Sequence, residues 1–470
     1  MGKVLTRVAV CGAGAMGSGI AQVAAQSGAH VLVFDVSEAA LESSRSRILG
    51  SLDSLAQKGR LTVEAAQAAK DRLVWVSSLD ALAGCELVIE AIIEDAPIKG
   101  ELFEQLEAVV APDAIIATNT SSLPVSRLAR GLKQAHRFVG MHFFNPATVM
   151  KLVEVVAGAA SDRQVCADVL ATAQAWGKVA IAVADVPGFI VNRVARPFYA
   201  EGFTALTEGA AGAAEIDALF RGAGFRMGPL ELTDLIGQDV NFAVARSVYE
   251  GYFGRARFVP QLRQAALVDA GWLGRKSGQG VYAYPAGVPP VAGEVHVEPI
   301  SAAQAQAAAW LRGNGGDQVE CEGILLARTA GATAKAESLR LGRPVALLDW
   351  QVPGDGMVAY AATDDAAAAC ARGVLAALGH PALRVADRPG LIVARTLAQI
   401  ANAAADAVLE QVADEAGVDA ALRFGANYPF GPFGWADGVG RARLVAMLAA
   451  IADETGEALY RPSHYLRATA

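Results

Sequence analysis

Short apolar runs alternate with helical patterns over the first 185 residues of the chain. The runs are nearly continuous in Val, Ile, Leu and Ala, which is typical of strands covered by helices on both faces. Strands that alternate with helices form a parallel, doubly wound sheet, so this part predicts an α/β domain. The expected strands are Val8–Cys11, Val31–Phe34, Val74–Val76, Leu87–Ala91, Ile115–Thr118, Phe138–His142, Leu152–Val156 and Val179–Val183.

Helical patterns replace the strands after Pro187–Gly188 and continue to about Gly280. These segments are rich in Ala and contain few β-branched runs, so they predict an all-helical domain. The stretch from Tyr284 to Gly293 concentrates Pro and Gly, as an interdomain linker does.

The helical part occurs twice in the sequence. Residues Asp185–Arg193 return as Asp387–Arg395, and Gly228–Pro229 returns as Gly431–Pro432. The second copy begins with the tail of an α/β unit and has no glycine-rich loop. We therefore expect a doubly wound domain in residues 1–185, a helical domain in 186–284, a linker in 285–300, a short α/β connecting segment in 301–386 and a second helical copy in 387–470.

Composition narrows the classes of function. The chain has 470 residues, of which 53% are hydrophobic, enough for the cores of about three domains. A net charge of −8 and a pI of about 5.4 offer no basic face to a nucleic acid. The apolar segment Val179–Val191 is interrupted by Asp185 and Pro187, and it falls short of a membrane span. The first residues show no export signal, so we expect a soluble, cytoplasmic protein without a membrane partner.

The five cysteines are odd in number and far apart in the sequence, so they define neither a disulfide framework nor a Cys-x-x-Cys site. We expect reduced and mostly buried thiols. They are Cys11, Cys85, Cys166, Cys321 and Cys370.

A glycine-rich loop, Gly12-Ala13-Gly14-Ala15-Met16-Gly17, connects the first predicted strand to the first predicted helix. Glycines at this place allow a tight turn and let a pyrophosphate approach the positive end of the helix. The spacing alone is a weak signal, but its position between strand and helix favours a Rossmann-type dinucleotide site over a purely structural turn. Gly12, Gly14 and Gly17 are therefore candidate cofactor residues.

Asp35 ends the second predicted strand and is placed to accept hydrogen bonds from the hydroxyls of an adenosine ribose. Its carboxylate would repel a ribose 2′-phosphate, and no Arg follows directly, so NAD is favoured over NADP. The alternative is that Asp35 caps the helix that begins near Ser37.

His142 lies at the end of a predicted strand, where the ligands of doubly wound sheets bind. Glu154 interrupts the apolar run of the next strand, and a buried carboxylate needs a partner. The two residues together suggest a general base whose tautomer is fixed by an acid. Taken separately, each residue has an alternative interpretation: His142 as a histidine packed in the core, and Glu154 as a glutamate on an edge strand.

Several motifs occur in one order and with one set of spacings, and together they resemble L-3-hydroxyacyl-CoA dehydrogenase over residues 1 to about 284. The doubled helical domain resembles the longer bacterial members, which act on 3-hydroxybutyryl-CoA or 3-hydroxyadipyl-CoA. The motifs are the glycine-rich loop, Ile89–Glu94, Asn119–Ser122, Gly140–Pro146, Lys151–Val155 and Pro187–Arg193.

The resemblance implies a role for each matching residue. His142 takes the proton from the substrate 3-hydroxyl while C3 delivers a hydride to the nicotinamide, and Glu154 orients the imidazole. Ser121 and Asn192 lie around the reacting oxygen and the thioester, which implies an active site between two domains. From the residues alone, Ser121 and Asn192 have the alternative of capping helices.

The resemblance also implies that Glu94, Lys99 and Asn119 line the nicotinamide side, although by themselves they indicate solvated loop and helix residues. Basic residues after the second strand are candidates for the phosphates of coenzyme A, but a helix with basic residues is usually a solvated face. These basic residues are Arg45, Arg47, Lys58 and Arg60.

The second copy lacks the matching residues. By the offset of the repeat, Asn192 corresponds to Ala394 and Glu154 to Gly356, and nothing corresponds to His142, so we expect this copy to be catalytically empty. The resemblance implies that shorter members dimerise through the helical domain. We hypothesise that residues 387–470 replace a partner subunit in cis, with further homo-oligomers left open. The alternative is a decayed duplication that only packs.

The sequence thus predicts an NAD-dependent oxidoreductase that converts (S)-3-hydroxyacyl-CoA to 3-ketoacyl-CoA and needs no metal. One alternative is a dehydrogenase of a free 3-hydroxy or sugar acid; the β-hydroxyacid class uses a catalytic lysine where this chain has Asn192-Arg193. Another alternative is a non-catalytic NAD sensor or scaffold. Residues 301–385 are too short for a separate hydratase domain. The sequence leaves the acyl group and the oligomeric state open.

Overall fold

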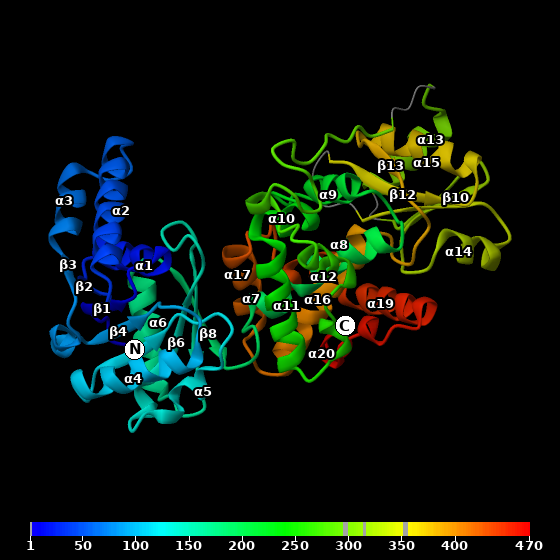
Figure 1. Cartoon of the computed structure of the whole chain (residues 1–470). Helices are drawn as coiled ribbons and strands as arrows, with labels where there is room; N and C mark the ends of the chain where they lie inside the picture. The colour runs from blue at the N-terminus through cyan, green and yellow to red at the C-terminus, as the bar shows by residue number, and fades with distance from the viewer. Residues whose placement is uncertain (1, 295–298, 314–315, 351–355) are drawn as a thin grey trace. The chain divides into compact units, whose positions relative to one another are not determined.

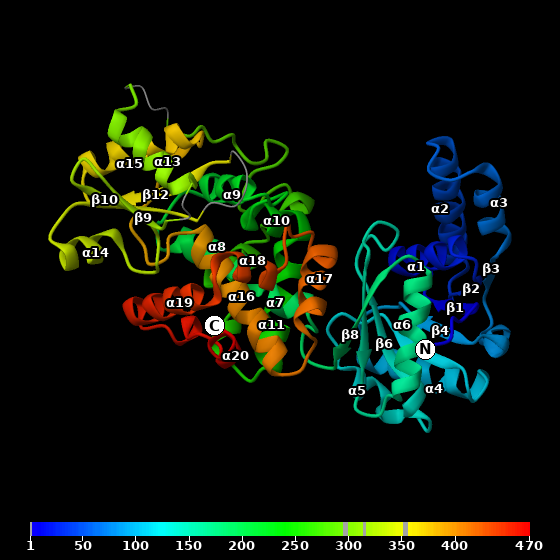
Figure 2. The ribbon, with the colours of Figure 1, turned by 180° about the vertical axis from the view of Figure 1, so that it is seen from behind.

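The computed structural model describes residues 2–294, 299–313, 316–350 and 356–470. The chain forms two compact units, one from Met1–Val191 with Glu410–Ala426 and the other from Asn192–Leu409 with Asn427–Ala470 (Figure 1; Figure 2). Part of the predicted linker, residues 295–298, lies outside the described residues. None of the helices in the described ranges is long and apolar enough to cross a membrane.

An eight-stranded sheet forms the centre of the first unit, in the order β3-β2-β1-β4-β5-β6-β7-β8. All eight predicted strands are present, and their ends differ from the prediction by at most one residue. The strands are β1 (Arg7–Cys11), β2 (His30–Phe34), β3 (Leu73–Val76), β4 (Leu87–Glu90), β5 (Ile115–Thr118), β6 (Phe138–Phe143), β7 (Leu152–Ala157) and β8 (Val179–Ala184).

The Rossmann-type α/β fold is confirmed, but one pair of strands differs from the parallel arrangement expected. β6 and β7 pair antiparallel, with His142 directly opposite Glu154. Only residues 144–151 separate these strands, whereas a parallel connection needs a crossover of about a dozen residues or more. The short connection therefore fixes the antiparallel pairing and brings the two predicted catalytic residues face to face.

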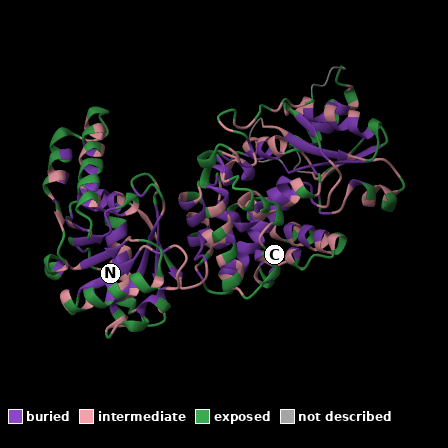
Figure 3. Ribbon diagram, in the orientation of Figure 1, coloured by how far each residue is buried: buried purple, intermediate pink, exposed green. Residues whose placement is uncertain are grey.

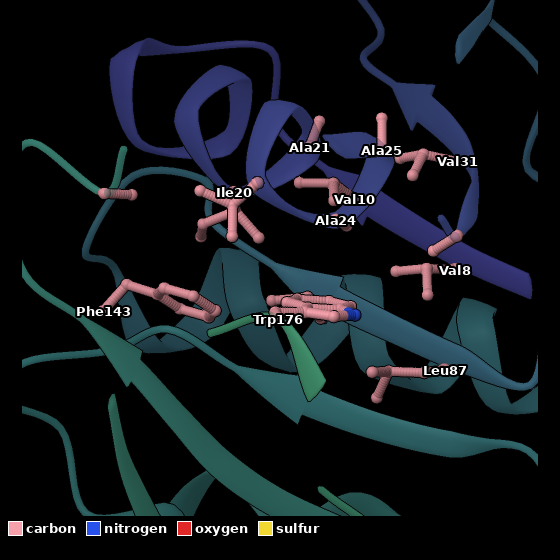
Figure 4. Packing of buried hydrophobic residues seen from close by; sticks show 14 of the residues in the cluster. Val8, Val10, Ile20, Ala21, Ala24, Ala25, Val31, Leu87, Phe143 and Trp176 are labelled. Atoms are coloured by element: carbon pink, nitrogen blue, oxygen red, sulfur yellow. The ribbon is translucent and has the colours of Figure 1, made fainter. Parts of the chain in front are cut away.

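Helices cover the first sheet and bury its apolar strands. Ile20 and Ala24 on α1 belong to the same buried cluster as Val8 and Val10 on β1, and Figure 4 shows their side chains close together. Buried residues follow the strands, while exposed residues lie on the outer faces of the helices (Figure 3). The helices are α1 (Ala15–Gln26), α2 (Glu38–Gln57), α3 (Val63–Asp71), α4 (Ala96–Val109), α5 (Val125–Leu128) and α6 (Arg163–Ala175).

Two sets of helices follow, as the repeat predicts. Gly228 and Gly431 precede matching helices that each begin with Pro, so the repeated sequence forms the same local structure twice. The first set is α7 (Val191–Val194), α8 (Arg196–Thr207), α9 (Ala213–Gly222), α10 (Pro229–Ile236), α11 (Gln238–Gly251) and α12 (Leu262–Asp269). The second set is α16 (Val393–Leu409), α17 (Glu415–Gly425), α18 (Pro432–Val439), α19 (Arg441–Thr455) and α20 (His464–Ala468).

A second, five-stranded sheet lies in the second unit, where the sequence predicts a short α/β segment. Its order is β13-β12-β11-β10-β9. The strands are β9 (Gln318–Cys321), β10 (Ile324–Arg328), β11 (Val345–Leu348), β12 (Val358–Ala362) and β13 (Ala382–Arg384), and the helices are α13 (Ala302–Gly313), α14 (Ala334–Leu341) and α15 (Asp365–Leu378).

The duplication extends further toward the N-terminus than the sequence indicates. β10–β13 repeat the pairing directions of β5–β8, namely parallel, antiparallel and parallel. Asp185 accepts hydrogen bonds from the first two amides of α5 at 2.9 and 2.7 Å, and Asp387 does the same for α14 at 2.8 and 2.9 Å. The second copy therefore repeats half of the first α/β domain as well as its helices.

Candidate active site

Two glycines of the glycine-rich loop are required by the backbone around them. Gly12 has a φ of +110°, and a Cβ there would lie 2.5 Å from the carbonyl oxygen of Ala91, while a Cβ on Gly17 would collide with the carbonyl oxygen of Gly12. Gly14, at the N-cap of α1, is different, because a Cβ there would meet nothing within 4 Å. This open space at a helix N-terminus fits the pyrophosphate of a dinucleotide.

Asp35 holds the glycine-rich loop from the end of β2. Its Oδ2 accepts a hydrogen bond from the amide of Ala13 at 2.8 Å, and its Oδ1 accepts one from the amide of Ser37 at 2.9 Å. Ser37 is the N-cap of α2, and its side chain accepts from the amide of Ala40, so the alternative that Asp35 caps this helix is wrong. The carboxylate instead stands beside the loop, where a ribose would be bound.

His142 and Glu154 form a buried pair in the middle of the β6–β7 ladder. His142 Nδ1 lies 2.7 Å from Glu154 Oε2, and the two residues are 5% and 0% exposed. Glu154 Oε1 also accepts hydrogen bonds from the amides of Ile190 and Val191 at 3.1 and 3.0 Å. An ionised Glu154 keeps the proton on Nδ1, so Nε2 is the nitrogen that can accept a proton from a substrate.

Two aromatic rings lie against the imidazole of His142. The ring centroids of Phe144 and Phe189 are 4.5 and 5.7 Å from that of His142. Phe189 has a φ of +48°, a strained conformation for a residue with a Cβ, and it directly precedes the amides that bind Glu154. The strained turn therefore supplies a ring to His142 and two donors to Glu154, a function that the Pro187–Arg193 motif alone did not reveal.

Lys99 is buried between two carboxylates. Its side chain is 1% exposed, and its Nζ lies 2.5 Å from Glu90 Oε1 and 3.2 Å from Glu94 Oε2. A buried ammonium is tolerated only with such compensation. The alternative that Lys99 is a solvated helix residue is therefore wrong.

Sequence reasoning missed Glu90 as a site residue. Glu90 is the last residue of β4 and fully buried, and its Oε2 accepts a hydrogen bond from Thr118 Oγ1 at 2.6 Å. A glutamate in an apolar strand is the signal that singled out Glu154, and the same signal marks Glu90. It connects the carboxyl ends of β4 and β5 to Lys99.

Glu94 organises the loop that carries Ser121. Glu94 Oε1 accepts hydrogen bonds from Thr120 Oγ1 at 2.6 Å and from the amide of Ser121 at 3.0 Å. Burial raises the pKa of this carboxyl, but the bond from Thr120 and the charge of Lys99 outweigh burial and leave the pKa below 4.5. Glu94 is therefore an anion at neutral pH.

The other predicted residues lie at separate places. Asn119 Oδ1 accepts a hydrogen bond from the amide of Phe143 at 2.8 Å, next to His142. Ser121 does not cap α5, because Asp185 accepts from the first amides of that helix. Asn192 is the second residue of α7 and belongs to the second compact unit. Its role at the site stays a prediction.

The basic residues proposed for coenzyme A are exposed on or just after α2. The guanidinium of Arg45 lies 4.9 Å from the centre of the Trp75 ring, and Arg47 Nη1 donates to Ser18 Oγ at 3.0 Å. Lys58 and Arg60 follow the helix at its C-terminal end. Binding of coenzyme A by these residues stays a prediction.

The sheet register corrects the alignment of the second copy. The amide of Asp349 donates to the carbonyl oxygen of Ala359 at 2.9 Å, so these residues face each other as His142 and Glu154 do. The equation of Gly356 with Glu154 is therefore wrong, because Ala359 occupies the position of Glu154. The position of His142 is taken by Asp349, so no histidine stands there. The reason is a shorter connection between β12 and α15 than between β7 and α6, which shifts the strand against the sequence offset.

Asp349 binds the start of a helix and faces no imidazole across the ladder. Its carboxylate accepts hydrogen bonds from the amides of Ile392, Val393 and Ala394 at 3.1, 2.8 and 2.8 Å. Burial raises the pKa of Asp349 from 3.8 to about 6, and the four amide bonds it accepts, one of them from Trp350, only partly oppose this shift.

The cysteines are mostly buried, as expected, with Cys166 only half-buried. Folding brings Cys321 and Cys370 together with Glu322, so that their ligand atoms lie within 4.8 Å of one another, which their sequence spacing did not indicate. Burial raises the pKa of both thiols of this pair, so they are neutral packing groups at neutral pH.

Two family models match the chain. The NAD binding domain of 3-hydroxyacyl-CoA dehydrogenase matches residues 7–186. The C-terminal domain of 3-hydroxyacyl-CoA dehydrogenase matches twice, over residues 188–284 and 390–470. The two matches to the C-terminal domain coincide with the repeated helices.

Two relatives match nearly the whole chain and a third matches 60% of it, and all three carry related names. The 3-hydroxyadipyl-CoA dehydrogenase of Escherichia coli (strain K12) is 43% identical over 462 residues, which cover 98% of this chain and 96% of that protein. A crystal structure of 3-hydroxybutyryl-CoA dehydrogenase from Escherichia coli K12 is 42% identical, covers 99% of this chain and 98% of its own, and has a TM-score of 0.93. The 3-hydroxybutyryl-CoA dehydrogenase of Bradyrhizobium diazoefficiens is 40% identical over 285 residues, 60% of this chain and 97% of that protein.

Proposed function

The chain belongs to the 3-hydroxyacyl-CoA dehydrogenase family, and we propose that its NAD-dependent oxidation of 3-hydroxyacyl-CoA uses the His142–Glu154 pair as the general base. The observation that supports this proposal is the 2.7 Å contact between His142 Nδ1 and Glu154 Oε2 at the carboxyl end of β6. When bound, NAD⁺ supplies the acceptor for the hydride that leaves C3 of the substrate.

His142 receives the proton of the substrate 3-hydroxyl on Nε2, because Nδ1 is engaged by Glu154. The imidazole becomes a cation in this step, and general-base catalysis of this kind contributes about 10²- to 10⁴-fold to the rate. The rings of Phe144 and Phe189 shield the imidazole and keep its orientation fixed.

Glu154 stabilises the imidazolium and keeps its ring in one orientation. The carboxylate cannot rotate freely, since its other oxygen is held by the amides of Ile190 and Val191. We assign Ser121 and Asn192 to the reacting oxygen and the thioester, and Glu94, Lys99 and Asn119 to the nicotinamide side. The glycine-rich loop and Asp35 would hold the pyrophosphate and the adenosine ribose.

We propose 3-hydroxyadipyl-CoA or 3-hydroxybutyryl-CoA as the substrate, because these compounds appear in the names of the relatives that match nearly the whole chain. The test is a kinetic panel with NAD⁺ that compares these two thioesters with longer 3-hydroxyacyl-CoA substrates and with free hydroxy acids, measured by the absorbance of NADH. We expect kcat/KM to be highest for one of the two named thioesters. A free 3-hydroxy or sugar acid as the best substrate would contradict the proposal.

We also propose that the protein works in the cytoplasm, where NAD and CoA thioesters are available.

We also propose that the second helical copy replaces a partner subunit in cis. Within the second unit α8 packs on α16, and Arg395 of the second copy is buried against Glu201 and Glu208 of the first, with N–O distances of 2.9 Å for each. In the other direction, Arg257 pairs with Asp406 at 2.8 Å. We expect the full-length protein to be a monomer by light scattering. A truncation at Tyr284 that stays soluble, active and unchanged in its assembly state would contradict the proposal.

A further inference from the structure

One helix of the second copy folds as part of the first compact unit. This helix, α17, packs on β7 and β8, and its neighbouring residue Val412 accepts a hydrogen bond from the amide of Ala184, at the end of β8, at 3.0 Å. Val418, Ala421 and Leu422 of α17 are completely buried. The first sheet, which carries His142 and Glu154, is therefore completed by residues more than 200 positions further along the chain.

The contacts of α17 converge on Glu154. A Cβ on Gly425 would collide with the side chain of Leu152 and lie 2.9 Å from Val191 Cγ2. Leu152 precedes Glu154 by two residues on β7, so both side chains point to one face of the sheet. Val191 is one of the two residues whose amides bind Glu154 Oε1.

A second glycine makes a similar approach one strand away. A Cβ on Gly417 would lie 3.1 Å from Ile181 Cγ2. Ile181 is the residue on β8 that pairs with Glu154 in the sheet register. α17 thus contacts Leu152, on the same face of β7 as Glu154, Ile181, which pairs with Glu154 from β8, and Val191, whose amide donates to the Glu154 carboxylate.

The second sheet shows the same close contact between a glycine at a helix end and a strand. Gly222, at the end of α9, lies so close to β12 that a Cβ there would be 2.8 Å from the amide nitrogen of Met357. The amide of Ala386 donates to the carbonyl oxygen of Ala210 at 2.9 Å, as Ala184 does to Val412. One helix of each helical copy therefore packs on the sheet of the other copy: α17 on the first sheet and α9 on the second.

We propose that α17 of the second copy is a positioning element for the catalytic pair, and that Gly425 is the residue through which it acts. The inference rests on the proposed function of His142 and Glu154. The backbone of α17 at Gly425 sets the places of Leu152 and Val191, and these set the orientation of the Glu154 carboxylate against the imidazole. The second copy thereby contributes to the chemistry of the first without touching the substrate.

The test is the substitution Gly425→Ala in the full-length protein, with Gly438→Ala as the matched control. Gly438 lies in α18, and a Cβ there meets nothing within 4 Å, so both changes alter helix propensity in the same way and only one disturbs the packing. We expect Gly425→Ala to lower kcat about tenfold, since small displacements of catalytic groups have effects of this size and larger. KM for NAD⁺ and for the acyl-CoA should stay within about twofold, because the pair contributes to turnover and not to binding.

A second variant shows whether the collision is the cause. Leu152→Ala in the Gly425→Ala background removes the nearer of the two side chains that the new methyl group meets, the other being that of Val191, so kcat should recover in part, as expected for two residues in contact. A wild-type kcat in Gly425→Ala, or a loss that Leu152→Ala leaves unrelieved, would overturn the proposal.

Failure of the positioning role can be distinguished from failure of the proposed function. If the wild-type protein oxidises no 3-hydroxyacyl-CoA, the proposed function fails, and amide hydrogen exchange then decides the positioning. We expect the amides of Ile190 and Val191, which bind Glu154, to exchange faster in Gly425→Ala than in Gly438→Ala. Equal exchange in both variants would refute the positioning role.

Discussion

The two sheets of this chain place different residues at the same register positions. In the first sheet His142 faces Glu154, and Glu154 binds the amides that open α7. In the second sheet Asp349 faces Ala359, and Asp349 itself binds the amides that open α16. Both sheets therefore hold an acid at the start of the following helix, but only the first adds an imidazole.

The turn that presents these amides is the same in both copies. Gly188 and Phe189 have φ values of +74° and +48°, and Gly390 and Leu391 have φ values of +73° and +56°. The turn and the buried acid thus form a structural device that does not depend on catalysis. The two copies therefore differ in His142 and in the Glu154 carboxylate, which binds both the start of α7 and the imidazole ring.

The largest expected difference between the sheets concerns the imidazole. His142→Gln should lower kcat by about 10²- to 10⁴-fold, because the proton of the 3-hydroxyl loses its acceptor. The control is His380→Gln in the second copy, where Nδ1 lies 3.0 Å from the carbonyl oxygen of Gly356. Steady-state kinetics with NAD⁺ and 3-hydroxybutyryl-CoA measure both. Activity of His142→Gln within tenfold of the wild type would contradict the assignment.

The acid of the second sheet should matter for stability instead. Asp349→Ala leaves buried amides without an acceptor, so we expect the free energy of unfolding to fall by about 4 kcal/mol, while kcat stays unchanged in the folded protein. Urea denaturation measures the loss. Asp365→Ala is the control, since the side chain of Asp365 is 97% exposed. A loss of kcat in Asp349→Ala without a loss of stability would show that the second sheet is not catalytically empty.

Glu154→Gln removes the charge but keeps an oxygen for the amides of Ile190 and Val191. We expect kcat to fall by about 10²-fold, because the imidazolium loses its counter-charge, and KM to stay within about twofold. The same chemical change in the other sheet, Asp349→Asn, should leave kcat unaltered. Equal effects of the two substitutions on kcat would remove the distinction between the sheets.

The smallest expected effect is a pH dependence of stability from the second sheet. Burial raises the pKa of Asp349 to about 6, above its ordinary value of 3.8, so between these values the folded state binds more protons than the unfolded state. Stability from this group is therefore present at low pH and falls by about 2 kcal/mol as the pH rises from about 4 to about 6. Asp349→Asn should remove this part of the decline, whereas Asp217, whose pKa burial also raises to about 6, keeps its own contribution. The free energy of unfolding of both proteins, measured at several pH values, tests this prediction. If it falls with pH as steeply in Asp349→Asn as in the wild type, Asp349 is not the source of the decline.

The strands and the dinucleotide loop could be predicted because their signals are local. A continuous apolar run, glycines at a fixed spacing between a strand and a helix, and a charged residue inside a strand are all visible in the sequence. By the same reasoning Glu90 could have been found. The direction of β6 and β7 could also have been inferred, since only residues 144–151 connect them.

The counterpart of His142 in the second copy could not be predicted from the sequence offset. A shorter connection before α15 moves β12 relative to the repeat, and only the ladder of hydrogen bonds shows that Asp349 faces Ala359. The packing of α17 on β7 and β8 could not be predicted either, because only tertiary contacts join segments so far apart in the sequence.

The sequence by itself determined the α/β class and the duplicated helices, and it singled out the candidate cofactor loop and the two residues of the proposed catalytic pair, because each depends on spacing within one element or motif. Only the tertiary structure decided that His142 and Glu154 stand opposite each other, that Asp349 takes over the helix-binding role in the second sheet, and that a helix of the second copy supports the strand of Glu154. These facts depend on strand register and on contacts between distant segments, and both are set by the packing of the whole domain and not by any local pattern.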